Sequence, residues 1–202
     1  MDSERKFIPI SHVYAGTRYE TFSLWSTEAA DRYFDILKNH RSQVIMEFSG
    51  HDHFSDLRVH HEDLLDKYHN IFIAPSITPW YSNNPGVTSL ELSAELVPQD
   101  LRSTFLNLNA TIGQEESLPY DQLEFRALSY EEQWGIDELT SHEIYRLAKR
   151  LDANDDLHID YIVRKIGLDP SIKAEFDKAK QIMAGKEIIY LGELEQITSM
   201  WP

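Results

Sequence analysis

The order strand, helix, strand within the first fifty residues constrains the fold of this chain more than any other feature. An apolar segment at residues 6–14 precedes a predicted helix that Ser26 caps and that runs to about His40, and a second apolar segment, residues 43–49, follows it. Spacings of i, i+3, i+4 and i+7 give the helix one apolar face, made of Ala30, Tyr33, Phe34 and Leu37. A crossover helix joins parallel strands, so we expect the carboxyl ends of both strands to lie side by side.

Three histidines follow the two predicted strands at this shared edge. His12 ends the first strand, and the stretch FSGHDHFSD places His51 and His53 directly after the second. Histidines one residue apart on extended backbone project from the same side, so these two can converge on one site while Asp52 points away. Neutral imidazole is a common ligand of zinc, iron and manganese. The spacing indicates a metal site, and loop histidines bonded to the backbone remain the alternative.

A β-rich part continues from these strands and gives way to a helical pattern near residues 110–120. Further strands are expected at residues 57–61, 70–76, 87–93 and 103–109. Helices are expected at residues 120–135, 140–153, 156–167 and 169–185, with 188–200 as a candidate fifth. Gly135, Gly167 and Gly185 each follow a periodic segment, as helix stops do. The predicted division is residues 1–112 and a helical part, 113–202.

Composition excludes several kinds of site and partner. The formal net charge of -15 disfavours nucleic acid, whose phosphates require clustered Lys and Arg. The chain has no cysteine, so a metal would be held by His, Asp or Glu. No stretch approaches the roughly 18 apolar residues of a transmembrane segment, and the start, MDSERKFIPIS, lacks the pattern of a signal peptide.

The acidic stretch DANDDLHID is a second candidate metal site. Asp152, Asn154 and Asp156 match the first three ligand positions of a calcium-binding EF-hand loop. Leu157 stands where that loop needs glycine, and Val163 where it needs a bidentate glutamate. An acidic turn between helices, with Asp155 as the N-cap, is therefore the favoured interpretation.

FSGHDHFSD resembles the Gly-His-x-His motif in the C-terminal part of calcineurin-like metallophosphoesterases. Three more segments, ISHVYAG, NIFIAPSITPWYSNNPGV and WGIDELTSHEIYRLAKRLDANDDLHIDY, narrow the resemblance to the acid-sphingomyelinase-like phosphodiesterases. Together they cover most of the chain. The resemblance implies an α/β (α+β) fold: the C-terminal half of a four-layer metallophosphoesterase β-sandwich flanked by helices, followed by a helical C-terminal tail.

The resemblance also implies hydrolysis of phosphodiesters with two divalent metal ions, usually zinc. His12 and His51 would bind one metal and His53 the other. The Asp-x-His, Gly-Asp-x-x-Asp and Gly-Asn-His-Glu motifs of the family's first half do not occur in this sequence. We therefore expect a second chain that carries the N-terminal half, or a larger assembly, and activity that depends on it.

Two alternatives differ from this conditional phosphodiesterase. One is a catalytically inactive descendant, a pseudoenzyme kept as a structural or interaction subunit. The other is a hydrolase with one metal, held by His12, His51 and His53 and with water in the fourth position. The family suggests a secreted or lysosomal protein, whereas the absence of cysteine and of a signal peptide leaves an intracellular location open. Catalytic and substrate-binding residues, and the substrate, stay unknown.

Overall fold

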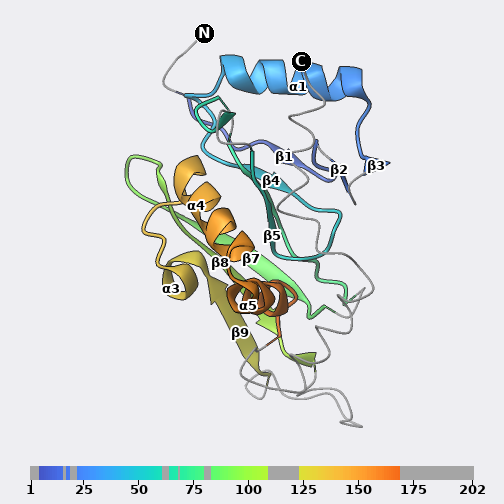
Figure 1. Ribbon diagram of the computed structural model, residues 1–202, viewed down its shortest axis with the longest axis vertical. Coiled ribbons are helices and arrows are strands. Elements are labelled where there is room, and N and C mark those ends of the chain that lie inside the picture. Colours follow the sequence, from blue (N-terminus) through green and yellow to red (C-terminus); the bar gives the residue numbers. More distant parts are fainter. Residues whose placement is uncertain are drawn as a thin grey trace.

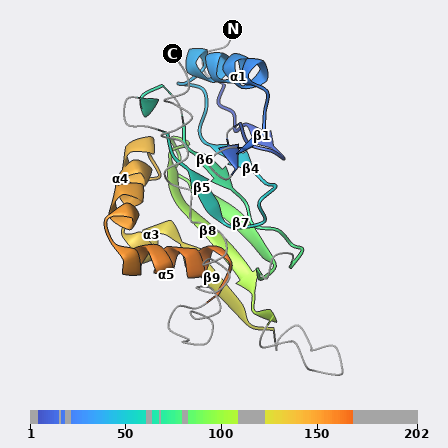
Figure 2. The same ribbon diagram turned by 45° about the vertical axis from the view of Figure 1, so that its right-hand side comes forward.

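A four-stranded sheet and a three-stranded sheet form the body of the molecule. The structure, a computed structural model, describes residues 5–15, 17–18, 22–60, 64–67, 69–79, 83–108 and 123–168. In Figure 1, α1 lies at one end of the molecule, while α3, α4 and α5 lie together at one side of the sheets; Figure 2 shows the same separation from a second direction. This arrangement is compatible with part of an α/β metallophosphoesterase fold. None of the helices within the described ranges is both long and apolar enough to span a membrane.

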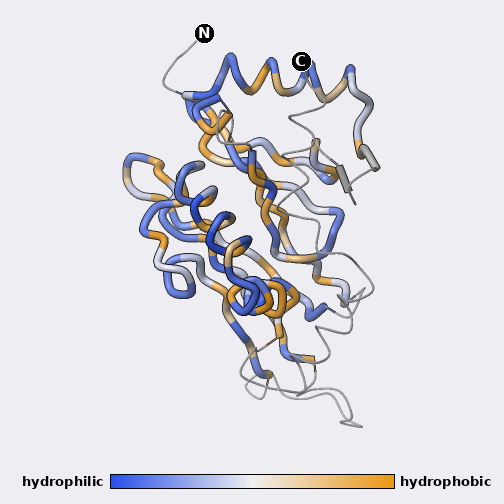
Figure 3. The backbone as a smooth tube through the Cα atoms, in the orientation of Figure 1, coloured by the Kyte–Doolittle hydropathy of each residue, from blue (hydrophilic) through white to orange (hydrophobic). Residues whose placement is uncertain are grey.

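The predicted strand, helix, strand unit is confirmed. Strand β1 (Ile10–Ser11) pairs in parallel with β4 (Glu47–Ser49), with Ile10 opposite Phe48. Between them runs α1 (Thr27–Asn39), whose N-cap Ser26 accepts a hydrogen bond from the Ala29 amide. Hydrophilic and hydrophobic residues alternate along α1 in Figure 3, as expected for a helix with one buried face. A short antiparallel pair, β2 (Thr17–Arg18) and β3 (Phe22–Ser23), lies between β1 and α1 in the chain.

The four-stranded sheet has the order β1-β4-β6-β5. Strand β6 (Ile71–Ile73) is parallel to β4, and β5 (Asp56–Arg58) is antiparallel to β6. Because side chains alternate across a sheet, Ile71 and Ile73 face Tyr14 on one side and Phe72 faces the main core on the other. Among the described strands β1 forms one edge, and its Ile10 is 80% exposed there.

The second sheet is antiparallel and corrects one prediction. It consists of β7 (Gly86–Leu92), β8 (Pro98–Leu106) and β9 (Phe125–Ser129). The sequence pattern predicted a helix from residue 120 to 135, but residues 125–129 pair with β8, and only α3 (Tyr130–Trp134) is helical. Five cross-strand pairs with β8 outweigh the helix propensity of this segment, in which Arg126, Ala127 and Leu128 are good helix formers.

The remaining described helices agree closely with their predicted positions. Helix α4 (Ser141–Asp152) and α5 (Asp155–Lys165) are capped by Thr140 and Asn154, respectively. The N-cap prediction for α5 was therefore wrong by one residue, because the side-chain Oδ1 of Asn154, not Asp155, accepts a hydrogen bond from the Leu157 amide. Gly135 and Gly167 follow their helices with φ of 64° and 77°, as predicted for helix stops. The helices predicted at 169–185 and 188–200, and Gly185, lie outside the described residues.

One core joins both sheets to the helices on their shared side. Phe72 of the first sheet contacts the ring of Tyr130 at 5.5 Å between centroids, and Trp134 lies 5.4 Å from Tyr161. Leu101, Leu147 and Leu151, almost fully buried, complete this cluster. Helices α4 and α5 are thus packed into the same core as the strands that carry the histidines.

Candidate metal centre

The parallel pairing of β1 and β4 brings His12 and His51 together. The Gly50 amide donates a hydrogen bond of 3.0 Å to the His12 carbonyl, which continues the pairing one residue beyond both strands. The imidazole rings of His12 and His51 then lie 5.3 Å apart between centroids, at an interplanar angle of 85°. His12 is exposed and His51 is half-buried, so both rings are open to a ligand from solvent.

The backbone of the Gly-His-x-His stretch is tightly turned, which corrects the expectation of extended backbone. His51 and His53 have φ of 76° and 68°, in the left-handed region that side chains with a Cβ seldom adopt. The Asp52 amide closes a three-residue turn by donating to the Gly50 carbonyl at 3.0 Å. Each left-handed histidine costs about 1–3 kcal/mol, so the surrounding contacts must hold this conformation.

Asp52, which the sequence predicted only to point away from the histidines, is fully buried between them in the chain. Its Oδ2 accepts hydrogen bonds from the Tyr14 hydroxyl at 2.9 Å and from Arg58 Nη2 at 2.8 Å. Arg58 also donates to Asp56 Oδ2 at 3.2 Å, and Lys165 Nζ lies 3.0 Å from the same oxygen. Two carboxylates and two cations therefore form one buried, electrically balanced network beneath the histidines.

The ionic state of this network follows from its charges. Burial alone would raise the pKa of Asp56, but the positive charges of Lys165 and Arg58 hold it below its usual value. Burial likewise works against the charged form of Arg58, but Asp56, Tyr14 and Asp52 together more than compensate, so the pKa of Arg58 is raised. Burial raises the pKa of the Tyr14 hydroxyl, which stays a hydrogen-bond donor at neutral pH.

His53 is held by both ends of the single connection between β6 and β7. Its carbonyl accepts hydrogen bonds from the Ser76 amide at 3.2 Å and from Asn83 Nδ2 at 3.3 Å. Asn84 contacts the residues that follow α5, because its Nδ2 donates a hydrogen bond to the Gly167 carbonyl at 2.8 Å. The Asn-Pro-Gly connector therefore borders the histidine stretch; its residues 80–82 lie outside the described part.

The separation of His12 and His51 can be compared with that of two ligands of one metal. Two imidazoles that share one zinc, with Zn–N distances of about 2.0–2.1 Å, bring their ring centres to roughly 5 Å, and His12 and His51 already stand at 5.3 Å. Within the described ranges no three His, Asp or Glu side chains are grouped closely enough to hold a metal ion. The distance between the His12 and His51 rings is therefore compatible with a shared metal, and further ligands would have to come from outside the described residues.

The other polar candidates do not join this centre. Asn154 serves as the cap of α5, and Asp152 ends α4, so the acidic stretch is a turn between helices. His60 is buried and His69 is half-buried, and burial lowers the pKa of each to about 4, which keeps both neutral at pH 7.

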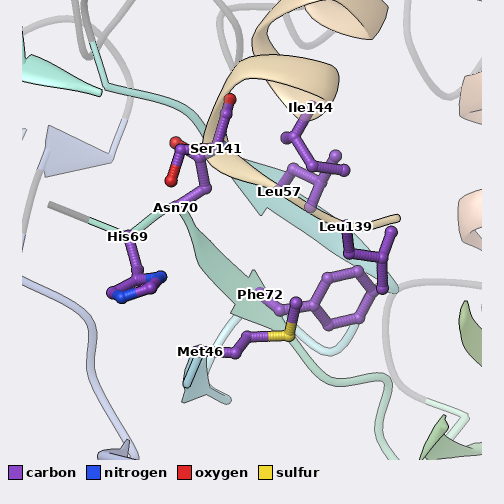
Figure 4. A pocket seen from close by; sticks show the side chains of 8 residues that line it. All are labelled: Met46, Leu57, His69, Asn70, Phe72, Leu139, Ser141 and Ile144. Carbon is purple, nitrogen blue, oxygen red and sulfur yellow. The ribbon is translucent and has the colours of Figure 1, made fainter. Parts of the chain in front are cut away.

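Two cavities lie away from His12, His51 and His53, and His69 lines both of them. The cavity in Figure 4 lies between Met46, Phe72 and Ile144; it has a volume of about 10 Å³, room for one water molecule. Asn70 at its rim links the first sheet to α4 by donating to the Ser141 carbonyl at 3.1 Å. A larger groove of about 280 Å³, lined in part by Lys6 and Arg41, also includes none of the three histidines.

Sequence reasoning found the histidines but missed the buried polar network next to them, whose members include Tyr14, Arg58, Asp56 and Lys165. A signal for two of them exists in the sequence. Arg58 interrupts the apolar residues of a predicted strand, and Lys165 lies in the apolar run YIVRKIG. A charged side chain at a position with core spacing is seldom buried unless it is paired.

Comparisons with known proteins confirm the resemblance on which the metal assignment rests. No protein-family model matches the chain. The human acid sphingomyelinase-like phosphodiesterase 3b is 21% identical over 169 residues, which cover 78% of this chain and 36% of the relative. The Mus musculus protein of the same name is 29% identical over 126 residues, covering 56% and 27%. The chain therefore spans about a third of the length of the curated relatives it matches.

Proposed function

We propose that this chain, a relative of acid sphingomyelinase-like phosphodiesterases, supplies the histidine-bearing part of a metal-dependent phosphodiesterase site. His12 and His51 bind one divalent metal, most simply zinc, and His53 binds a second. The contact between the His12 and His51 rings at 5.3 Å is the observation that carries this proposal. The remaining ligands come from residues outside this chain's described part, in a second chain or a larger assembly.

In the proposed reaction, the histidines of this chain act as metal ligands. Bound divalent metals would polarise a phosphoryl oxygen and lower the pKa of a coordinated water. His12 and His51 supply neutral nitrogen ligands at the carboxyl ends of two parallel strands, a usual place for sites in α/β sheets. The residue between His51 and His53, Asp52, is bonded to the buried side chains of Tyr14 and Arg58.

The open edge of β1 supports the proposed need for a partner. Ile10 is 80% exposed and Phe7 40% exposed along this edge of the described sheet. An unpaired strand edge with apolar side chains favours pairing with another segment. A partner that covers this edge would reach the exposed face of His12, two residues beyond Ile10.

A non-catalytic role is the second candidate. It is favoured by the lack, within the described ranges, of any carboxylate grouped with the histidines. A dinuclear site of the proposed kind needs a bridging carboxylate. A descendant without one would be a structural or interaction subunit and not an enzyme. A site with a single metal held by all three histidines receives no support from the grouping of the described side chains.

Zinc affinity tests the ligand assignment. In isothermal titration of the full chain with Zn²⁺, we expect His12→Ala and His51→Ala each to weaken binding about tenfold or more, because each removes a ligand. His142→Ala, at an exposed histidine in the first turn of α4, is the matched control. Equal affinities for His51→Ala and His142→Ala would show that the proposed pair does not bind the metal.

Hydrolysis of bis(p-nitrophenyl) phosphate tests the activity. We expect the full chain with Zn²⁺ to gain activity when it is mixed with the separately produced remaining part of a curated relative. The His51→Ala chain should not gain it, since that variant lacks a metal ligand. Histidine-dependent zinc binding without any hydrolysis in the mixture would favour the non-catalytic role.

A further inference from the structure

Beneath the histidines, the buried network extends from the Gly-His-x-His stretch to the helical C-terminal part. Asp52, between the two histidines, is tied to Tyr14 and Arg58 by hydrogen bonds of 2.9 and 2.8 Å. Arg58 Nη2 also donates to the Tyr14 hydroxyl at 2.9 Å, and the guanidinium lies 4.6 Å above the Tyr14 ring. These three side chains form a closed triangle under the turn, and all three are buried.

Helix α5 continues this triangle from the other side. Asp56 accepts hydrogen bonds from Lys165 Nζ at 3.0 Å and from the Tyr161 hydroxyl at 2.9 Å, and both donors belong to α5. The Ser55 amide donates to the Lys165 carbonyl at 2.9 Å, which joins the backbone of the two segments directly. Helix α5 therefore contacts the segment that follows His53 through an ion pair with Asp56 and through a backbone hydrogen bond with Ser55.

Apolar packing reinforces the same junction. Phe54, the residue after His53, is packed in a cluster with Val163, Ile166 and Leu168 at the end of α5. The Lys165 ammonium lies 5.9 Å from the centre of the Phe54 ring. Apolar residues on both sides of Lys165 thus pack against Phe54, the residue directly after the second histidine.

We propose that Tyr14, Asp52 and Arg58, backed by Asp56 and Lys165, are positioning residues that hold His51 and His53 in their left-handed backbone conformations. Without these contacts both histidines would relax to ordinary φ values, and their rings would turn away from His12. Helix α5 would then support the geometry of the metal centre although it contributes no metal ligand. The effect on metal affinity rests on the proposed function, whereas the effect on histidine geometry does not.

The test compares Tyr14→Phe and Lys165→Met with Asp100→Asn in the full chain. Asp100 is an equally buried carboxylate, but it caps α3 through the Tyr130 amide at 3.0 Å and does not touch the histidine stretch. NMR of the folded, metal-free proteins reads the backbone and imidazole signals of His51 and His53, and titration with Zn²⁺ reads the affinity. We expect both variants to shift these signals and to weaken zinc binding about tenfold, Asp100→Asn to do neither, and Lys165→Arg to restore the signals.

Unchanged His51 and His53 signals in folded Tyr14→Phe and Lys165→Met would overturn the proposal. If Lys165→Met does not fold, Tyr14→Phe, which removes a single hydroxyl, decides the question alone. Shifted signals in a chain that binds no zinc would support the positioning role and contradict the proposed function. Histidine-dependent zinc binding together with unmoved signals would contradict the positioning role alone.

Discussion

Replacing Lys165 with methionine is expected to lower the free energy of unfolding by about 3–5 kcal/mol. Lys165 and Arg58 together balance Asp52 and Asp56 inside the protein, and all four side chains are almost fully buried. Without Lys165, two carboxylates share one guanidinium, which leaves an uncompensated negative charge in the core. Chemical denaturation of the wild-type and variant chains measures the difference.

A double-mutant cycle separates this charge effect from lost packing. Asp56→Asn in the Lys165→Met background restores the charge balance, because only the Asp52–Arg58 pair remains. We expect the double variant to be more stable than the sum of the two single changes predicts. Strict additivity of the two changes would mean that Lys165 and Asp56 do not stabilise one another, contrary to their 3.0 Å contact.

Replacing Glu47 with glutamine is expected to stabilise the protein at pH 8 by roughly 3 kcal/mol and to have little effect at pH 4. Glu47 is buried beneath α1, and although the Tyr33 hydroxyl donates to it at 2.7 Å, burial raises its pKa from 4.5 to about 7. The folded protein therefore binds a proton more tightly than the unfolded chain does. The stability that this proton provides is complete below pH 4.5, falls between pH 4.5 and 7, and is lost above pH 7.

The measurement is the free energy of unfolding against pH for wild type, Glu47→Gln and Glu91→Gln. Glu91 is an exposed carboxylate of β7, so its variant controls for the loss of one negative charge. His60 and His69 act in the opposite direction, because their lowered pKa values increase stability as pH rises from about 4 to 6.5. The difference between wild type and Glu47→Gln removes that contribution. A difference that does not change with pH would show that Glu47 has an ordinary pKa.

The features that the sequence predicted correctly are those encoded by residues close together in the chain. The Ser26 cap and the apolar spacing of Ala30 and Leu37 are local patterns, and α1 forms where they indicate. The parallel order of β1 and β4 follows from the chirality and length of one crossover. His12 and His51 could therefore be placed at one edge from sequence alone.

The features that it missed depend on distant partners. β9 is a strand because β8 offers it five paired positions, and the segment itself carries no strong strand pattern. The left-handed backbone at His51 and His53 has no signal in residue type, since neither residue is glycine. The partner of Asp56 on α5 is 109 residues away in the chain, beyond the reach of any periodicity.

That separation has a consequence for the order of events in folding. Gly50 to Asp56 leave the ribosome long before Lys165 does, so the turn that carries the histidines is synthesised without the helix that clamps it. Contacts at such a distance must overcome the entropy of closing a long loop, and they form late. The histidine turn is therefore expected to take its final shape among the last steps of folding, after β4 and β6 have paired.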